Sequence, residues 1–548
     1  MGLLERFLPR IEFDSYEDFI ENYRLNVPER FNFGFDVVDA WAELEPSKKA
    51  LVWCDDNGGE EVFTFADIAE KSGQAANWFA AQGIQKGDAV LLILRRRWEY
   101  WVCAVALHKL GAVVVPASLQ LTSKDIAYRL EAARIKLLVC VADEGLLKQA
   151  DEANTPVKRA VVAGEREGWL PFDIGGYPSS FPRPMGEGAV GNGDTMLVYF
   201  SSGTTGMPKM VRHTFIHPLG QIVTAKYWQR VREDKLHMSV SDSGWAKFGW
   251  GKIYGQWICG ACIFAYDMEK FVPKNLLQKM QDYRLTTFCA PPTMYRFMLQ
   301  EDIASYDLSS IERYCNAGEP LNPEVFERMR ALTGRELAEG FGQSESSVLI
   351  ATFPWLAAKP GSMGKPSPLY DIDLVNEEGE SCETGEEGEI VVRGLQNPSG
   401  LFTEYLGDAE ANAKAFRNGC YYTGDVAWRD DDGYYWFVGR NDDVIKCSGY
   451  RIGPFEVESA LIQHESVLEC AVTAAPDPVR GQVVKATVVL KRGFSPSDKL
   501  AKELQEHVKR VTAPYKYPRI VVFSEELPKT ASGKIKRAEI RKITEQNS

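Results

Sequence analysis

The chain has 548 residues, 45% of them hydrophobic and 25% charged, which describes a globular protein with several subdomains. Its 63 lysines and arginines against 76 aspartates and glutamates give a net charge of −13, which argues against a general nucleic-acid-binding protein. No apolar run approaches a membrane span, and charges interrupt the apolar N-terminal stretch, so we expect no integral membrane segment and no secretory signal. The eleven cysteines show no framework, and we expect reduced thiols in a cytoplasmic protein.

The first part of the chain alternates strand and helix patterns. Residues 1 to about 35 are expected to form a helical leader with aromatic anchors, which are Phe13, Tyr16, Phe19 and Tyr23. Further elements are then expected in the order strand 62–65, helix 66–83, strand 88–94, helix 98–110, strand 112–116, helix 123–133 and strand 136–141. This rhythm predicts an α/β fold with a doubly wound sheet. No GxGxxG opens these helices, so an NAD-type dinucleotide fold is not supported.

The second part changes character twice. Helix-like residues 216–230 lead into three strand patterns, at 285–292, 314–320 and 336–346, of which the first ends in a Pro-Pro turn and the other two in small-residue turns. From about 361 to 441, short strand patterns with Gly- and Asp-rich turns predict a β-rich subdomain, with strands at 372–375, 388–393, 424–429 and 434–438. A new unit follows, with a helix at 454–464, strands at 467–474 and 485–490, and a helix at 498–511. We therefore divide the chain into an N-terminal domain, 1–441, and a C-terminal domain, 442–548.

The segment 199–209, Tyr-Phe-Ser-Ser-Gly-Thr-Thr-Gly-Met-Pro-Lys, runs from a strand pattern into a loop of hydroxyls and glycines. Glycines tolerate positive φ and let backbone N–H groups turn toward an anion, and Lys209 adds a positive charge. The composition is that of a phosphate cradle, although a solvated Ser/Thr/Gly loop remains open on composition alone. The P-loop of kinases and GTPases is excluded, because it ends in Gly-Lys-Ser/Thr.

The segment 339–345, Glu-Gly-Phe-Gly-Gln-Ser-Glu, follows a strand pattern with a small-residue turn. Adjacent Ser344 and Glu345 suit a hydroxyl on a phosphate and a carboxylate on Mg²⁺, which prefers one or two carboxylates plus phosphate oxygens. Helix capping would use the same residue types, so this segment alone leaves both interpretations open.

These two segments resemble the two signatures of adenylate-forming enzymes, which are the acyl-CoA synthetases, the luciferases and the adenylation domains of peptide synthetases. Tyr421–Asp425 and Gly439–Asp443 resemble further motifs of the family, and the resemblance covers nearly the whole chain in motif order. It implies a large N-terminal domain of doubly wound α/β subdomains with a β-rich part, and a small mobile α+β C-terminal domain. The implied hinge is Asp442.

The resemblance also implies a role for each motif. Ser344 touches the α-phosphate, Glu345 holds Mg²⁺, Asp425 and Arg440 hold the ribose, and Lys534 stabilises charge that develops at the α-phosphate. The full set of implied ATP-binding residues is Ser201, Ser202, Gly203, Thr204, Thr205, Gly206, Met207, Pro208, Lys209, Gly318, Glu319, Pro320, Glu339, Gly340, Phe341, Gly342, Gln343, Ser344, Asp425, Arg440 and Lys534.

Within the family, four runs are similar to the medium-chain acyl-CoA synthetases, or butyrate–CoA ligases, at 241–245, 448–454, 476–481 and 511–519. The last three resemble CoA-contacting segments of that branch. The implied CoA-binding residues are Ser448, Gly449, Tyr450, Arg451, Arg480, Lys509 and Arg519. Without the resemblance, the basic residues among them would be ordinary surface cations, but a cationic track on an acidic chain suits a phosphate-rich cofactor.

One position departs from the acetate-activating relatives, in which a tryptophan precedes the Gln of the second signature and closes the acyl pocket. Here that position is Gly342, which predicts room for a longer or wider acyl group. Each further buried CH₂ contributes roughly 0.8 kcal/mol, so medium-chain or branched and aromatic acids are favoured over acetate. The predicted pocket residues are Trp245, Trp250, Gly318, Gly342 and Gly364.

The resemblance implies a ligase that uses ATP, Mg²⁺ and CoA, as a monomer or homodimer. Adenylation converts a poor electrophile, the carboxylate, into an acyl-AMP, and this transfer needs positioning and charge neutralisation more than acid–base groups. Three alternatives remain open: transfer of the acyl group to a carrier protein, a luciferase-like oxidation, and a non-catalytic nucleotide-binding regulator.

Overall fold

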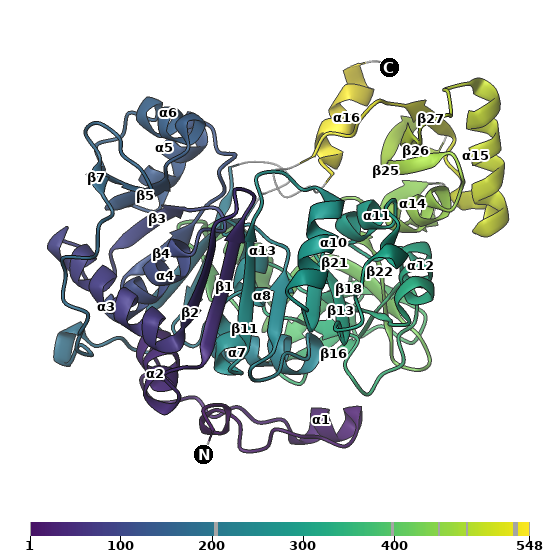
Figure 1. The fold of residues 1–548 in the computed structure, drawn as a ribbon. Coiled ribbons are helices and arrows are strands. Elements are labelled where there is room, and N and C mark those ends of the chain that lie inside the picture. The colour runs from purple at the N-terminus through teal and green to yellow at the C-terminus, as the bar shows by residue number, and fades with distance from the viewer. Residues whose placement is uncertain are drawn as a thin grey trace.

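The structure is a computed structural model that describes residues 2–201, 207–395, 399–447, 450–477, 480–529 and 535–546. It has a large N-terminal domain and a smaller C-terminal domain, which stands apart at the upper right of Figure 1 in light green to yellow. The mixed α/β class predicted from the sequence is confirmed, and strands up to Arg440 lie in two large sheets while strands from Ile445 onward lie in a third.

The smaller of the two large sheets has eight strands, and most of its neighbouring strands are parallel. The expected strands at 88–94, 112–116 and 136–141 are its β3, β4 and β5, whose apolar residues are buried on both faces as helices cover a parallel sheet. In spatial order the strands are β19 (Glu404–Tyr405), β9 (Lys209–Thr214), β8 (Thr195–Ser201), β4 (Val113–Pro116), β3 (Ala89–Ile93), β5 (Leu137–Val141), β6 (Lys158–Val162) and β7 (Leu170–Pro171).

The larger sheet has fourteen strands and includes the region predicted as a separate β-rich subdomain. The antiparallel strands β14, β15 and β16 join the two regions, so the β-rich part continues the sheet. In spatial order the strands are β17 (Asp371–Val375), β18 (Glu387–Arg393), β21 (Cys420–Arg429), β22 (Tyr435–Arg440), β16 (Ser362–Pro366), β15 (Ile350–Ala351), β14 (Leu337–Phe341), β13 (Arg313–Ala317), β12 (Thr287–Ala290), β10 (Leu236–Ser239), β11 (Cys262–Asp267), β1 (Lys49–Asp55) and β2 (Glu60–Thr64), with β20 (Phe416–Arg417) beside β21.

Helices of the N-terminal domain begin and end at recognisable signals. Thr64 and Thr122 each form a capping box with the aspartate three residues later, and Gly111 ends its helix in the left-handed conformation. The α-helices are α1 (Tyr16–Asn22), α2 (Ala40–Leu44), α3 (Phe65–Ala81), α4 (Glu99–Leu110), α5 (Ser123–Ala132), α6 (Glu144–Glu152), α7 (His217–Ile222), α8 (Ala246–Gly251), α9 (Tyr254–Ile258), α10 (Pro273–Asp282), α11 (Pro292–Met298), α12 (Pro323–Thr333) and α13 (Ala409–Ala415). A π-helical segment, Val223–Trp228, completes the helix expected at 216–230.

The N-terminal leader differs from the prediction. Most of residues 2–35 are irregular, and α1 is its longest helix. The aromatic spacing that suggested a continuous helix instead serves contacts across the fold: the Phe19 ring lies 4.6 Å from that of Tyr227 and 5.0 Å from that of Trp355. Tertiary packing of these rings therefore stabilises a mainly extended segment.

The C-terminal domain is a small sheet covered by helices. Its strands are β24 (Tyr450–Ile452), β23 (Ile445–Cys447), β26 (Gly481–Leu490) and β25 (Val467–Asp477), with β27 (Ile520–Phe523) beside β26. The helices are α14 (Pro454–Ile462), α15 (Asp498–Val511) and α16 (Arg537–Gln546). Leu500, Leu504 and Val508 form the buried face of α15, at the i, i+4, i+8 spacing of an amphipathic helix. No helix among the described residues is long and apolar enough to cross a membrane.

Candidate active site

A cavity of about 2060 Å³ lies where loops leave the carboxyl ends of β8, β10, β12, β13 and β14, and residues of the C-terminal domain also line it. Ligands of open α/β sheets bind at such strand ends. The predicted ATP-binding residues that line it are Ser201, Met207, Pro208, Lys209, Gly318, Glu319, Pro320, Glu339, Gly340, Phe341, Gly342, Gln343, Ser344, Asp425 and Arg440, together with Glu345. Other predicted residues lie outside the described part of the chain: Ser202, Gly203, Thr204, Thr205, Gly206, Ser448, Gly449 and Lys534.

The two residues predicted to hold the ribose face each other on neighbouring strands. Asp425 on β21 pairs with Arg440 on β22, and the guanidinium lies 3.4 Å from the carboxylate. The Asp425 carboxylate raises the pKa of Arg440 further above its usual value. Gln343 ties this pair to the second signature, because its amide donates to the Thr423 carbonyl at 2.8 Å and to Asp425, and accepts from Tyr421 at 2.5 Å. An acceptor and a cation held rigidly in this way can bind the hydroxyls of a sugar.

Glu345 is held by a segment that the sequence analysis missed. The Tyr405 hydroxyl donates to its carboxylate at 2.8 Å, and the Phe402 N–H donates to its carbonyl at 2.6 Å. Desolvation raises the pKa of Glu345, and the Tyr405 hydrogen bond opposes that shift. The ammonium of Lys209 lies 4.7 Å from the centroid of the Tyr405 ring, so one phenol contacts a residue from each signature. A single oriented carboxylate beside the Ser344 hydroxyl fits a Mg²⁺ ion that takes its other ligands from phosphates and water.

His213 is a second residue that the sequence analysis did not place in the site. It lies on β9, and its Nε2 is 2.7 Å from the backbone carbonyl of Ser344. Burial lowers the pKa of His213 to about 4, so a neutral imidazole donates this hydrogen bond and fixes the turn that carries Ser344. No sequence motif links these two residues, which are far apart in the chain.

Glu339 is buried, with 5% of its surface exposed. One carboxyl oxygen accepts from the Leu321 N–H at 3.1 Å, and the other has no hydrogen-bond partner among the described residues. Burial raises the pKa of Glu339 to about 8, so the group is mainly a neutral carboxyl at pH 7. Since Glu339 lines the cavity, it can donate or accept a hydrogen bond with a bound base.

The acyl end of the cavity differs from the prediction at Gly342. A Cβ atom at this position would lie 2.3 Å from Cη2 of Trp250, so the indole fills the space that the glycine was expected to leave empty. The Trp250 Nε1 donates to the Ser346 carbonyl at 2.9 Å, and its ring meets Trp228 edge to face at 6.3 Å. Trp250 therefore forms a fixed wall of the cavity.

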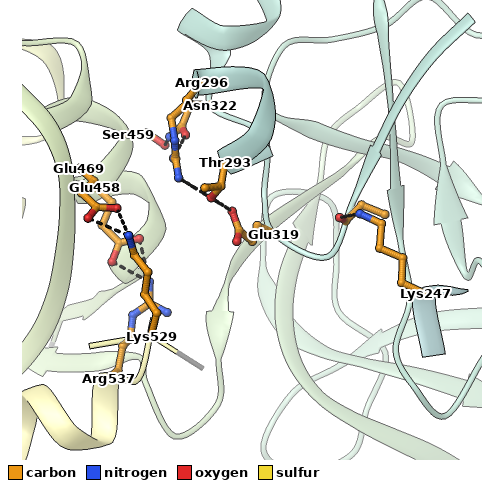
Figure 2. Close-up of polar contacts among 11 residues, drawn as sticks. Lys247, Thr293, Arg296, Glu319, Asn322, Glu458, Ser459, Glu469, Lys529 and Arg537 are labelled. Carbon is orange, nitrogen blue, oxygen red and sulfur yellow. Dashed lines mark hydrogen bonds and ion pairs between the residues drawn. The ribbon is translucent and has the colours of Figure 1, made fainter. Parts of the chain in front are cut away.

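Of the other predicted acyl-pocket residues, two line the cavity and one does not. Trp245 and Gly318 line the cavity, and beside them Lys247 reaches across to donate to the Ala317 carbonyl at 2.6 Å (Figure 2). Gly364 does not line it. A Cβ there would lie 2.2 Å from the Ala351 backbone, so Gly364 permits a close approach of strands, and its neighbour Met363 faces the cavity.

The described CoA candidates lie away from this cavity. Tyr450 is half exposed and stacks on Tyr515 at 4.2 Å, while Arg451 pairs with Glu377 at 2.9 Å. Lys509, Arg480 and Arg519 likewise do not line the cavity. The C-terminal residues that do line it include Lys529 and 535–539, which flank the position of Lys534 in the sequence. The proposed hinge, Asp442, lies between β22 and β23.

The fold and the site together suit an α/β enzyme that binds a nucleotide, because carboxylate, hydroxyl and cationic side chains converge on one cavity at the strand ends. The chain matches the family model of AMP-binding enzymes over residues 38–406 and that of their C-terminal domain over 456–534. It is 42% identical over 547 residues to the acyl-coenzyme A synthetase ACSM3, mitochondrial, of Mus musculus, covering 97% of this chain and 93% of that protein. It is also 42% identical over 529 residues to the human ACSM5, mitochondrial, covering 94% and 91%.

Solved structures similar to this chain include CoA ligases of the same family. The anthranilate CoA ligase AuaEII in complex with anthranoyl-AMP superposes with a TM-score of 0.87 at 28% identity, covering 95% of this chain and 98% of that one. A benzoate CoA ligase from Burkholderia xenovorans gives 0.82 at 28% identity, covering 93% and 100%. The chain therefore belongs to the adenylate-forming AMP-binding enzymes, within their medium-chain acyl-CoA synthetase branch.

Proposed function

We propose that this AMP-forming acyl-CoA synthetase joins medium-chain, or branched and aromatic, carboxylic acids to CoA. In the first half-reaction a carboxylate oxygen attacks the α-phosphorus of ATP, and pyrophosphate leaves as acyl-AMP forms. In the second, the CoA sulfur attacks the acyl carbon, its proton is lost, and AMP leaves. The observation that carries the proposal is the convergence on one cavity of the described residues of both signatures, the Asp425–Arg440 pair and the residues that flank Lys534 in the sequence.

In the proposed adenylation step the residues act mainly by position and charge. Asp425 and Arg440 hold the ribose, Ser344 and Lys209 contact phosphates, and Lys534 stabilises charge on the α-phosphate. Glu345, oriented by Tyr405, would hold Mg²⁺, which supplies neutralisation of phosphate charge. None of these groups needs to transfer a proton, which fits the absence of a catalytic triad from the motifs found.

The proposed acyl site lies between Trp245, Trp250 and Gly318. The indole of Trp250 limits the width beside Gly342, so the choice of acid depends on the space in front of that ring. Relatives named as anthranilate and benzoate CoA ligases support including aromatic acids in the proposed range.

For the second half-reaction we propose that the C-terminal domain, residues 442–548, turns about Asp442. Tyr450, Arg451, Arg480, Lys509 and Arg519, with Ser448 and Gly449, would then contact CoA. None of the described members of this set lines the cavity in the present arrangement, which supports a second arrangement for the CoA step.

Location and assembly remain proposals as well. We propose a cytoplasmic protein, although the names of the curated relatives read mitochondrial. Subcellular fractionation of the tagged full-length chain distinguishes the two compartments. We propose a monomer or homodimer, which sedimentation at several concentrations tests.

The test of function is pyrophosphate release from ATP and Mg²⁺ over a panel of acids, from acetate to dodecanoate with benzoate and branched acids, with and without CoA. Acid-dependent release that turns over only with CoA supports the ligase and ranks its substrates. Release that ignores CoA would indicate another acceptor, and no release with any acid would refute the proposal.

A further inference from the structure

A chain of polar contacts runs from the nucleotide cavity to the C-terminal domain (Figure 2). Glu319, on the cavity wall, accepts from the Thr293 hydroxyl at 2.7 Å, and Arg296 donates to the same hydroxyl at 2.7 Å. Arg296 also donates to the Asn322 side-chain oxygen at 3.2 Å. The Asn322 amide nitrogen then donates to the Ser459 hydroxyl at 3.0 Å, which crosses from the N-terminal to the C-terminal domain.

The orientation of the Asn322 amide is fixed by its neighbours. A guanidinium can only donate, so the Asn322 oxygen must face Arg296 and its NH₂ must face Ser459. Asn322 is also the residue that precedes helix α12, a position where an Asn side chain ordinarily accepts from the first turn of the helix. Here it makes no such bond. Asn322 is buried, with 3% of its surface exposed, and its side chain makes the interdomain hydrogen bond instead of capping the helix.

On the C-terminal side, the contact adjoins the supports of the segment that contains Lys534. Glu458, next to Ser459 on α14, pairs with Arg537 at 2.6 Å. Glu469 on β25 pairs with Lys529 at 2.7 Å. Lys529 and Ile535 face each other as an antiparallel bridge, and the Lys536 N–H donates to the Pro528 carbonyl at 2.9 Å. The residues on either side of the 530–534 segment are therefore paired with α14, the helix that carries the interdomain contact, and with β25.

We propose that Asn322 and Ser459 are positioning residues that dock the C-terminal domain on the nucleotide cavity for adenylation, and that this contact is released for the CoA step. The inference rests on the proposed change of domain arrangement between the half-reactions. Arg296 and Thr293 hold the Asn322 side chain with its NH₂ group toward Ser459. Because Glu458 and Glu469 pair with Arg537 and Lys529, docking of the domain also positions the residues that flank Lys534.

The test is a double-mutant cycle with Asn322→Ala, Ser459→Ala and the double variant, measured in each half-reaction separately. Adenylation is followed as hexanoate-dependent exchange of pyrophosphate into ATP. The CoA step is followed with synthetic hexanoyl-AMP and CoA. The matched control is Ser497→Ala, which removes the hydrogen bond from Leu500 at the start of α15 and touches no residue of the interface. Thermal unfolding of every variant is measured alongside.

Loss of a part-buried hydrogen bond predicts an adenylation rate lower by about three- to tenfold in each single variant. The double variant should catalyse adenylation no more slowly than the slower of the two single variants, and the rate of the CoA step should be unchanged in all three. Ser497→Ala should change neither the adenylation rate nor the rate of the CoA step. Parallel losses in both half-reactions would overturn the proposal, since a merely structural contact lowers both. Independent, multiplying effects or unchanged adenylation would also overturn it. Absence of exchange in the unaltered enzyme with hexanoate and with every other acid of the panel would instead refute the proposed function itself.

Discussion

Replacing Trp250 by alanine should shift the acid preference toward longer chains. The indole occupies the space beside Gly342 and is held there by the hydrogen bond to Ser346 and by contact with Trp228. Its removal opens the acyl end of the cavity, and each CH₂ that enters the new space gains about 0.8 kcal/mol, or about fourfold in kcat/KM. An acid three methylenes longer than the present optimum should therefore gain roughly 60-fold relative to that optimum.

The assay is kcat/KM for linear acids from acetate to dodecanoate, reported as ratios to the best substrate of the unaltered enzyme. Removing a buried tryptophan costs about 3–5 kcal/mol of stability, so Trp250→Leu serves as a milder variant. Trp169→Ala is the matched control: Trp169 is a buried tryptophan that donates to Asp151 and does not line the cavity. A uniform fall of kcat/KM across all acids, with the ranking kept, would refute the reasoning.

Three further results are expected. Lys534→Ala should slow adenylation by about two to three powers of ten, and an unchanged rate of pyrophosphate exchange would show that another group carries this charge. Tyr405→Phe removes the hydrogen bond to Glu345, so titration calorimetry should show weaker binding of Mg²⁺ with a non-hydrolysable ATP analogue, by about tenfold, with metal-free nucleotide binding and melting temperature kept. Burial raises the pKa of Glu339 from the ordinary 4.5 to about 8, so its carboxyl binds a proton more tightly in the native state than in the unfolded state. The free energy of unfolding should therefore fall as pH rises between these two values, by up to about 1.4 kcal/mol per pH unit. Glu339→Gln should reduce this pH dependence in denaturant titrations at pH 6 and 8, and an equal pH dependence in the two proteins would contradict the reasoning.

The C-terminal domain was the easiest part to predict from sequence. The helix expected at 498–511 is α15, and the strands expected at 467–474 and 485–490 lie within β25 and β26. α15 has one buried face, so its apolar residues recur at helical spacing, whereas β25 and β26 each contain a run of four consecutive buried residues, as strands covered on both faces do. The prediction of a helical leader was wrong because its aromatic residues recur at helical spacing but pack their rings against Tyr227 and Trp355, which are distant in sequence.

In the site, too, features set by neighbouring residues were predicted from the sequence, and features set by residues distant in the chain were not. The signature residues follow one another along the chain, so their motifs predicted which of them would meet. The side chains that hold them come from elsewhere: Tyr405 for Glu345, and His213 for the Ser344 backbone. The error at Gly342 has this origin too, because whether a glycine leaves a void depends on which ring reaches it from another helix, here Trp250 of α8.

The contacts between the two domains bear on how such a site can serve two half-reactions. They include the Asn322–Ser459 hydrogen bond, the Arg451–Glu377 ion pair and the edge contact of Phe437 with Phe455. A hydrogen bond of this kind contributes about 0.5–1.5 kcal/mol, and a partly exposed ion pair about 0–1 kcal/mol. Contacts of this size orient a domain yet can be exchanged for others. Arg451, a proposed CoA ligand, is held by Glu377 in the present arrangement, so releasing that pair would free the cation for the cofactor as the domain turns.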